Sequence, residues 1–489
     1  MSPAEQRKKY LRATLILACL AQFMVILDVS VVNVALPSIR RALGFTLSDL
    51  QWVVNAYTVT FAGFLLLGGR AADLLGRRRV FVSGLVLFAL ASLGGGLSNS
   101  QTVLIVMRLI QGLGGAVIAP ASLSILTSTF TEPRERNRAV GLWGAMGGAG
   151  GAAGVLLGGI LTDLLGWRWI LFINVPIGLI AAYLAQRMIA EGRNPNAAKG
   201  FDLSGALTAT VGLSLLVFGI VRTDTTGWGN GGTIGLILAG LALLGVFVAL
   251  EGHFAKSPLM PLRLFASRSL TAANLVIMLL GASTFAMWFF FSLYLQDVKG
   301  YSPLHAGVTF LPMTICIVIF STVASRYTIR VGAKRLLVGG MFFLSVGMFL
   351  FAQLSTTSTY LGAMLAPGLV TSIALPFGMI PATIAATNGV ARQGAGLASG
   401  VVNTARLLGG ALGLAILATL ASSQSKSDLR HPTAAIHTVN QALTNGFHVA
   451  FLVAAGMALA GALVAALGMP SLKTRPAEAP ESQRVAVEV

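Results

Sequence analysis

Residues 12–37 read RATLILACLAQFMVILDVSVVNVALP, and this stretch decides the fold class. It exceeds the roughly 20 residues that cross a bilayer as a helix, and it carries one acid, Asp28. A secretory signal has an apolar core of only about 7 to 15 residues, followed by a small-residue cleavage site. The stretch is therefore predicted to be a retained first membrane helix that ends at Pro37.

The rest of the 489-residue chain repeats this apolar pattern. Hydrophobic residues make up 55% and charged residues 10%, with a mean hydropathy of +0.81, whereas a soluble protein has roughly 25% charged residues. Such a chain cannot cover a water-facing surface, and it is predicted to be an all-α polytopic membrane protein with 14 transmembrane helices and no sizeable soluble domain. The expected spans are 12–37, 49–69, 79–97, 101–127, 137–161, 168–190, 202–221, 232–251, 269–293, 303–325, 334–353, 358–385, 396–421 and 447–469.

The chain is strongly basic, with 34 Lys and Arg against 16 Asp and Glu. These basic residues lie between the apolar stretches, so they indicate membrane orientation, and a nucleic-acid partner is not expected. An even number of spans puts both termini on one side, and most of the basic residues fall in the termini and in the loops of that side. The positive-inside rule then predicts cytoplasmic termini in a cell membrane. The absence of any Asn-x-Ser/Thr acceptor agrees with a bacterial protein.

One acid lies well inside a predicted span. Asp28 falls within LDVSVVNVALP (residues 27–37), and an ionisable group at this depth costs at least roughly 2.5 kcal/mol, so it usually faces the bundle interior and marks an ion or proton path. Arg108 in the fourth span lies at a compatible depth. We expect the two to form a pair that protonation of Asp28 releases, with Gln111 on the same helix face as Arg108. A permanently paired structural carboxylate is the alternative.

A second motif, GRAADLLGRRRV, occupies residues 69–80 after the second span. Its glycines allow a tight turn, and its charges could hold the cytoplasmic side closed. An arginine-rich loop that only anchors the topology is the alternative. The residues assigned to this gate are Gly69, Arg70, Asp73, Gly76, Arg77 and Arg78.

The fifth span is rich in glycine, and small residues at such intervals let helix backbones approach closely. These glycines could serve tight helix packing alone, or they could also let the helix bend. The glycines in question are Gly141, Gly150, Gly154, Gly158 and Gly159.

Polar and aromatic side chains in several spans are candidates for a substrate cavity. Asn403 and Arg406 stand at i and i+3, which puts an amide and a cation on one helix face. Trp288 precedes Phe289, Phe290 and Phe291, which could meet an amphipathic ligand. Packing and interfacial aromatics are the alternative. The cavity candidates are Asn33, Asn55, Tyr57, Gln111, Trp288, Asn403 and Arg406.

These stretches together resemble the major facilitator superfamily, and within it the fourteen-helix drug:proton antiporters. The similar segments include LDVSVVNVALP, GRAADLLGRRR, RLIQGLGG (residues 108–115), WRWILFINVPIG (167–178), LQDVKGYSPLHAG (295–307) and GLASGVVNTARLLGGALG (396–413). The resemblance implies proton coupling by Asp28 and Arg108, and a cytoplasmic gate around Asp73 and Arg77. In the fifth helix, Val155 stands where the family motif has proline, which weakens any expectation of a proline hinge.

The resemblance also implies the major facilitator fold, two six-helix bundles plus two inserted helices. The expected organisation is a cytoplasmic N-terminus at 1–11, a first bundle at 12–190, inserted helices at 202–251, a second bundle at 269–469 and a disordered tail at 470–489.

The sequence bears on four function classes. The favoured one is a proton-coupled exporter of an amphipathic small molecule, such as an antibiotic, that works by alternating access. An ATP-driven exporter is disfavoured because no lysine follows a glycine, so no phosphate-binding loop and no nucleotide is expected. A membrane enzyme is disfavoured because no acid pair lies in the membrane and the five histidines lie in loops or at helix ends, and neither a cofactor nor a metal is expected. A facilitator or importer of a small nutrient on the same fold stays open.

Overall fold

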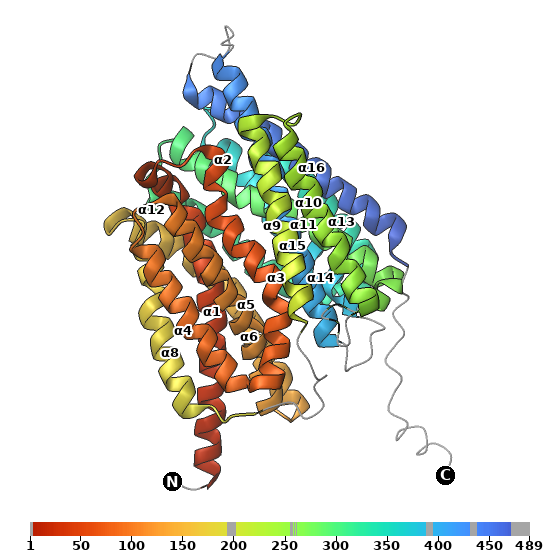
Figure 1. Ribbon diagram of the computed structural model, residues 1–489. Coiled ribbons are helices and arrows are strands. Elements are labelled where there is room, and N and C mark those ends of the chain that lie inside the picture. The colour runs from red at the N-terminus through yellow and green to blue at the C-terminus, as the bar shows by residue number, and fades with distance from the viewer. Residues whose placement is uncertain are drawn as a thin grey trace.

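The structure is a computed structural model that describes residues 3–192, 202–254, 258, 260, 262–387, 395–430 and 438–470. In these ranges all regular secondary structure is helical. Fourteen of the described segments are long and apolar enough to cross a membrane, as predicted (Figure 1). The predicted tail at 470–489 lies outside the described residues except for Pro470.

The membrane helices form two bundles of six. The first bundle contains α1 (Pro3–Leu43), α3 (Trp52–Leu75), α4 (Arg77–Gly96), α5 (Gln101–Thr129), α6 (Pro133–Leu164) and α8 (Asn174–Met188). The second contains α11 (Arg268–Leu293), α12 (Pro303–Val331), α13 (Ala333–Phe351), α14 (Leu365–Thr387), α15 (Ala395–Arg430) and α16 (Val439–Gly468). Within each bundle the helices pack mainly on one another, and the bundles meet through the pairs α6 with α12, α3 with α15, and α1 with α11.

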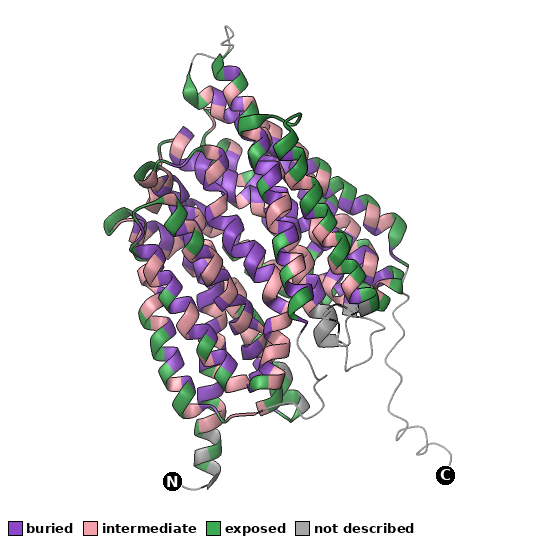
Figure 2. Ribbon diagram, in the orientation of Figure 1, coloured by how far each residue is buried: buried purple, intermediate pink, exposed green. Residues whose placement is uncertain are grey.

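Two further membrane helices, α9 (Leu203–Thr226) and α10 (Gly231–Ala249), come between the bundles in sequence. Helix α9 packs on α3 and on α15, so it contacts both bundles. Helix α10 packs mainly on α9, and only Thr233 and Gly240 are buried along its length. Figure 2 shows this helix as largely exposed, which fits a surface that lipid covers.

Helix α1 extends beyond the predicted end at Pro37 and continues to Leu43. A proline inside a helix leaves the carbonyl four residues earlier without its usual donor. Here that carbonyl belongs to Asn33, and it accepts a hydrogen bond of 2.7 Å from the Ser292 hydroxyl of the second bundle. The helix therefore tolerates Pro37 because another helix supplies the missing donor.

The last two membrane helices are also longer than predicted. Helix α15 continues to Arg430, nine residues beyond the expected end of its span, and α16 begins at Val439. Both extensions are polar segments that hydropathy alone does not include. Thr438 caps α16 with a capping box that involves Gln441.

Candidate functional site

Asp28 and Arg108 are in contact in the interior of the first bundle. One guanidinium nitrogen of Arg108 (Nη1) lies 2.5 Å from Oδ2 of Asp28, and both side chains are almost fully buried, with exposed fractions of 2% and 0%. Arg108 also donates from Nε to the carbonyl of Val53 at 3.0 Å, and from Nη1 to Oε1 of Gln111 at 2.7 Å. The pairing that the sequence suggested is thus present as geometry.

The second carboxylate oxygen of Asp28 accepts hydrogen bonds from two amides. Gln111 donates to Oδ1 at 2.8 Å, and Asn174 of α8 donates to the same atom at 2.9 Å. Both amides also contact the Ser92 hydroxyl at 3.1 Å, and this hydroxyl donates to the carbonyl of Leu171 at 2.9 Å. Helices α1, α5 and α8 therefore meet at one carboxylate, and α4 supplies the Ser92 hydroxyl that the two amides share.

Sequence reasoning did not assign Asn174 or Ser92 to this site. Asn174 is 146 residues from Asp28 in the chain, and Ser92 resembles many serines that bond to their own helix backbone. Asn174 did leave a signal, because it is a buried amide within the otherwise apolar sequence ILFINVPIG. Buried polar groups need partners, and this position therefore pointed to a polar neighbour.

A cavity of about 260 Å³ lies between the two bundles. Helices α1, α3 and α6 line it from the first bundle, and α11, α12, α14 and α15 line it from the second. Its walls are mostly apolar and aromatic, with side chains such as Phe61, Phe285, Trp288 and Phe310. A mostly apolar cavity with a few polar groups suits an amphipathic small molecule.

Four of the seven predicted cavity residues line this space, namely Asn33, Tyr57, Trp288 and Arg406. Tyr57 connects the cavity to the buried pair, because the Arg108 guanidinium lies 4.5 Å from the centre of its ring. This distance is within the range of a cation–π contact. A single side chain thus touches both the substrate-sized space and the partner of Asp28.

Three of the predicted cavity residues are absent from the lining that the structure describes. Gln111 is occupied by Asp28 and Arg108. Asn55 is fully buried and donates to Gln51 of its own helix at 3.3 Å. Asn403 lies behind the lining, where its Oδ1 accepts a hydrogen bond of 3.0 Å from Arg406. The described hydrogen bonds of these three side chains are therefore with other protein groups and not with the cavity.

The three phenylalanines after Trp288 are also not cavity residues. They are buried in the second bundle with exposed fractions of 1% or less. Phe290 contacts Phe447 and Phe451, and Phe291 contacts Phe310 and Phe351. The alternative to a ligand contact was packing, and the structure shows that these residues pack in the core.

The glycines of α6 face two different partners. Gly150, Gly154 and Gly158 form a ridge against α1, where a Cβ atom at Gly158 would lie 2.9 Å from Cα of Val31. Gly159 faces the second bundle, where its Cβ would lie 2.7 Å from the carbonyl of Pro303 on α12. Gly141 faces open space. Val155 is buried, and α6 is unbroken from Pro133 to Leu164.

The predicted gate motif forms the turn between α3 and α4. Gly76 has a φ of 111°, a conformation that favours glycine. Arg77 lies 3.5 Å from Oδ1 of Asp73, and the Ser124 hydroxyl lies 3.4 Å from the same oxygen. Gly69 packs near Pro120, and Arg70 donates to the carbonyl of Pro258 at 3.2 Å.

Glu191, which no sequence motif singles out, also contributes to this turn. Its carboxylate accepts hydrogen bonds from the backbone amides of Arg78 and Arg79 at 3.1 and 3.2 Å. It therefore caps the first turn of α4, where a negative charge is favourable. In the described residues, the charged side chains of the predicted gate contact groups of the first bundle, Glu191 and the Pro258 carbonyl in the segment before α11.

Four polar contacts join described residues of the two bundles, and all four lie toward the end of the molecule away from the start of α1. Ser292 donates to the Asn33 carbonyl, and Gln296 donates to the Val34 carbonyl at 2.7 Å. Arg40 forms an ion pair of 3.2 Å with Asp297. The fourth contact joins the Ser48 and Ser422 hydroxyls at 3.2 Å.

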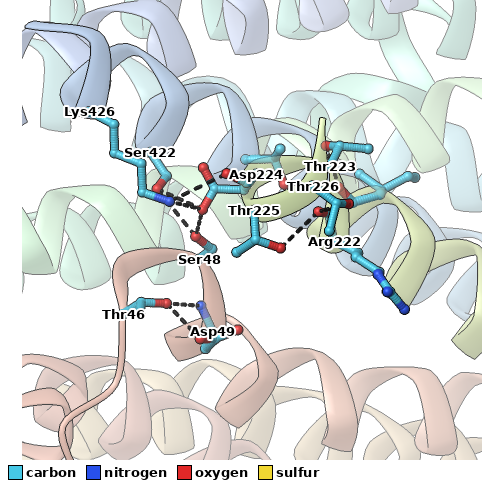
Figure 3. Close-up of polar contacts among 12 residues, drawn as sticks. Thr46, Ser48, Asp49, Arg222, Thr223, Asp224, Thr225, Thr226, Ser422 and Lys426 are labelled. Atoms are coloured by element: carbon cyan, nitrogen blue, oxygen red, sulfur yellow. Dashed lines mark hydrogen bonds and ion pairs between the residues drawn. The ribbon is translucent and has the colours of Figure 1, made fainter. Parts of the chain in front are cut away.

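The inserted helix α9 adds a charge to this last contact (Figure 3). Oδ2 of Asp224 accepts hydrogen bonds from Ser422 at 3.0 Å and from Lys426 at 2.7 Å, and it also contacts the Ser48 hydroxyl. The Asp224 side chain is fully buried, whereas Lys426 is 42% exposed. One carboxylate of α9 therefore holds side chains of both bundles. We call Ser48, Asp224, Ser422 and Lys426 the serine–aspartate cluster.

Comparison with known proteins places this architecture in a family. The model of the Major Facilitator Superfamily matches residues 18–414. The chain is 44% identical to the "Cephamycin export protein CmcT" of Amycolatopsis lactamdurans, over 84% of this chain and 85% of that protein. It is 38% identical to the "Puromycin resistance protein pur8" of Streptomyces alboniger, over 92% and 90% of the two chains.

Solved structures agree on the fold. A bacterial homologue of the human lysosomal transporter Spinster, in an inward-facing and unoccupied conformation, superposes with a TM-score of 0.66 at 17% identity, over 98% of this chain and 100% of that one. The xylose transporter XylE from E. coli, in an inward-open conformation, gives a TM-score of 0.63 at 15% identity, over 95% and 98%. The chain therefore belongs to the major facilitator superfamily of membrane transporters.

Proposed function

We propose that this protein exports an amphipathic small molecule, such as an antibiotic, in exchange for protons. The observation that carries the proposal is the buried Asp28–Arg108 pair beside an apolar cavity between two bundles. The named relatives that export or confer resistance to antibiotics support the direction of transport. The fourteen helices provide the multi-pass membrane framework in which such exchange takes place.

Asp28 is the proton carrier in this proposal. As an anion it is held by Arg108, Gln111 and Asn174. A proton on the carboxylate neutralises its charge, so these charge-assisted hydrogen bonds weaken. The contacts that hold α1, α5 and α8 together at Asp28 then weaken as well. Arg108 still has the Val53 carbonyl and Gln111 as acceptors. The Arg108 guanidinium then moves relative to the Tyr57 ring. Because Tyr57 lines the cavity, this movement alters the cavity wall.

Alternating access requires the bundles to part at the end where they now touch. The four polar contacts between the bundles must then break, and Gly159 must move away from Pro303. Basic residues dominate the loops on the side where α1 begins, so that side is assigned to the cytoplasm. With this assignment the four polar contacts close the extracellular side.

The test uses purified protein in proteoliposomes with an imposed pH gradient and an antibiotic panel as substrates. Wild-type protein should drive drug movement against its gradient, and the drug should in turn release protons. Asp28→Asn should abolish the proton-driven movement while the protein still binds drug. Asp163→Asn, a change at an exposed acid, is the matched control and should transport normally. Undiminished gradient-driven transport by Asp28→Asn would refute the coupling assignment.

A further inference from the structure

We propose that the cavity recognises amphipathic solutes that carry an anionic group, and that Arg406 of α15 binds this group. The inference rests on the proposed transport function, because it names the substrate class of the same cavity. Among the described residues that line the cavity, Arg406 is the only charged one. Its cation therefore sets the electrostatic preference of an otherwise neutral, apolar space.

Helix packing fixes the position of Arg406. Helix α15 lies against α11 at a close crossing, where a Cβ atom at Gly281 would clash with the carbonyl of Arg406 itself. Gly409 and Gly413 make similarly close approaches to α11. Because the backbone is held here, the guanidinium has a defined place, and it lies 5.8 Å from the ring centre of Phe285. This arrangement suits the polar end of a ligand whose apolar part rests on the aromatic walls.

Among the described residues, no carboxylate forms an ion pair with this guanidinium. The whole sequence has no Asp or Glu between Asp297 and Asp428, and these two are the only acids of the second bundle. Both have other partners: Asp297 pairs with Arg40, and Asp428 accepts from Gln424 and Asn445. In the first bundle, Asp28 is occupied by Arg108. A charge in a low-dielectric site is costly without a counter-charge, so a bound anion would supply what the protein lacks.

The hydrogen-bond inventory points to the same ligand. A guanidinium has five N–H donors, and the described contacts use one of them, from Nη2 to Asn403. Its Nε is buried without a partner in the described structure. By contrast, the lining hydroxyls of Ser30, Thr58 and Thr284 donate to backbone carbonyls. Besides the Tyr57 hydroxyl, which is also buried without a partner in the described structure, Arg406 is therefore the main source of unused donors in the lining. The planar fork of a guanidinium matches a carboxylate or phosphate.

The test compares three fluorescent probes of similar size that differ in charge. N-dansylphenylalanine is an acid, its methyl ester is neutral, and dansylcadaverine is a cation. Each is titrated onto purified wild-type protein, and dansyl fluorescence reports binding. We expect the acid to bind at least about tenfold more tightly than the ester or the amine, the fold-change that one charge-assisted hydrogen bond supplies.

Variants assign the preference to the residue. Arg406→Gln should weaken binding of the acid about tenfold to hundredfold and leave binding of the ester within about twofold. Arg406→Lys keeps the charge and should retain most of the preference. Arg222→Gln makes the same chemical change at an exposed position of α9 and should alter none of the three affinities. Equal binding of acid and ester by the wild type, or an equal loss of both in Arg406→Gln, would overturn the inference.

Transport separates this inference from the proposed function. In proteoliposomes with a pH gradient, export of all three probes at equal rates would refute the charge preference and leave proton-coupled export standing. If none of the probes or panel drugs moved with the gradient, the proposed function would fail, and the binding titration would still decide whether Arg406 selects anions. A lipid phosphate permanently held by Arg406 would give no preference for the acid, and the titration would show that too.

Discussion

Ser48 of the first bundle and Ser422 of the second place their hydroxyl oxygens 3.2 Å apart, although 374 residues separate them in the chain. Asp224 of the inserted helix α9 accepts hydrogen bonds from both. The two bundles and the inserted pair of helices therefore meet at one point. Bundle separation has to break such contacts, so substitutions at this point can test whether the bundles separate during transport.

The first prediction uses these two serines. Ser48→Cys with Ser422→Cys should form a disulfide on mild oxidation, because the side-chain atoms are within easy reach of a bond. The cross-linked protein should lose transport and recover it when a reductant is added. Each single variant, treated with the same oxidant, is the control, because it carries the same native free cysteines, Cys19 and Cys316. Full activity of the cross-linked form would show that this end never opens.

The second prediction concerns Asp224. Asp224→Asn removes the charge that Lys426 and two hydroxyls share, and should lower stability by about 1 to 3 kcal/mol because charge-assisted hydrogen bonds to a carboxylate become weaker bonds to a neutral amide. It should also reduce the yield of the Ser48–Ser422 cross-link. Thermal unfolding and the cross-linking yield measure the two effects. Asp49→Asn, in the same loop region but bonded only locally to Thr46, should change neither. An unchanged cross-linking yield in Asp224→Asn would show that α9 does not help to hold the two bundles together at this end.

The third prediction tests the amide that the sequence did not reveal. Asn174→Ala removes a hydrogen bond from Asp28 and another from Ser92, and should impair proton-driven transport. Asn445→Ala is a matched control, because it also deletes an amide bonded to an aspartate, here Asp428 at 2.8 Å. Both changes should cost about 1 to 3 kcal/mol in stability. Only Asn174→Ala should uncouple drug movement from protons, and equal transport by the two variants would remove Asn174 from the coupling site.

The fourth prediction concerns the two faces of α6. Gly159→Ala adds a Cβ that would lie 2.7 Å from the Pro303 carbonyl, so the bundles cannot approach as closely at this end. Overpacking of this kind costs about 1 to 3 kcal/mol. The variant should favour the conformation in which the extracellular side is open, measured as increased labelling of a cysteine placed at Ser292. Gly141→Ala, at a position with open space, should label like the parent protein.

The number and class of helices could be read from the sequence because hydropathy and length are local properties. Residues such as Asp28 and Arg108 also stood out, since an ion in an apolar span is rare and needs a partner. The Pro37 boundary was wrong because the donor that rescues the Asn33 carbonyl, Ser292, comes from the other end of the chain. Local rules for proline do not contain such a partner.

The rest of the site depends on which helix faces meet, and no local signal encodes that. Gln111 and Asn403 carry suitable amides, but packing turns them toward Arg108 and Arg406 and away from the lining of the cavity. The serine–aspartate cluster combines two ordinary serines with charges at helix ends, and each of these reads from the sequence as a loop or surface residue. Only the three-dimensional arrangement unites them.

The missing amide hydrogen of Pro37 has one further consequence. While the bundles touch at this end, Ser292 satisfies the Asn33 carbonyl. Once they part, lipid offers no donor in its place, so we expect water to reach this oxygen. Asn33 is five residues from Asp28, or about 7.5 Å along the helix axis. In the proposed exchange, Pro37 therefore favours water within two helical turns of Asp28 whenever the bundles part.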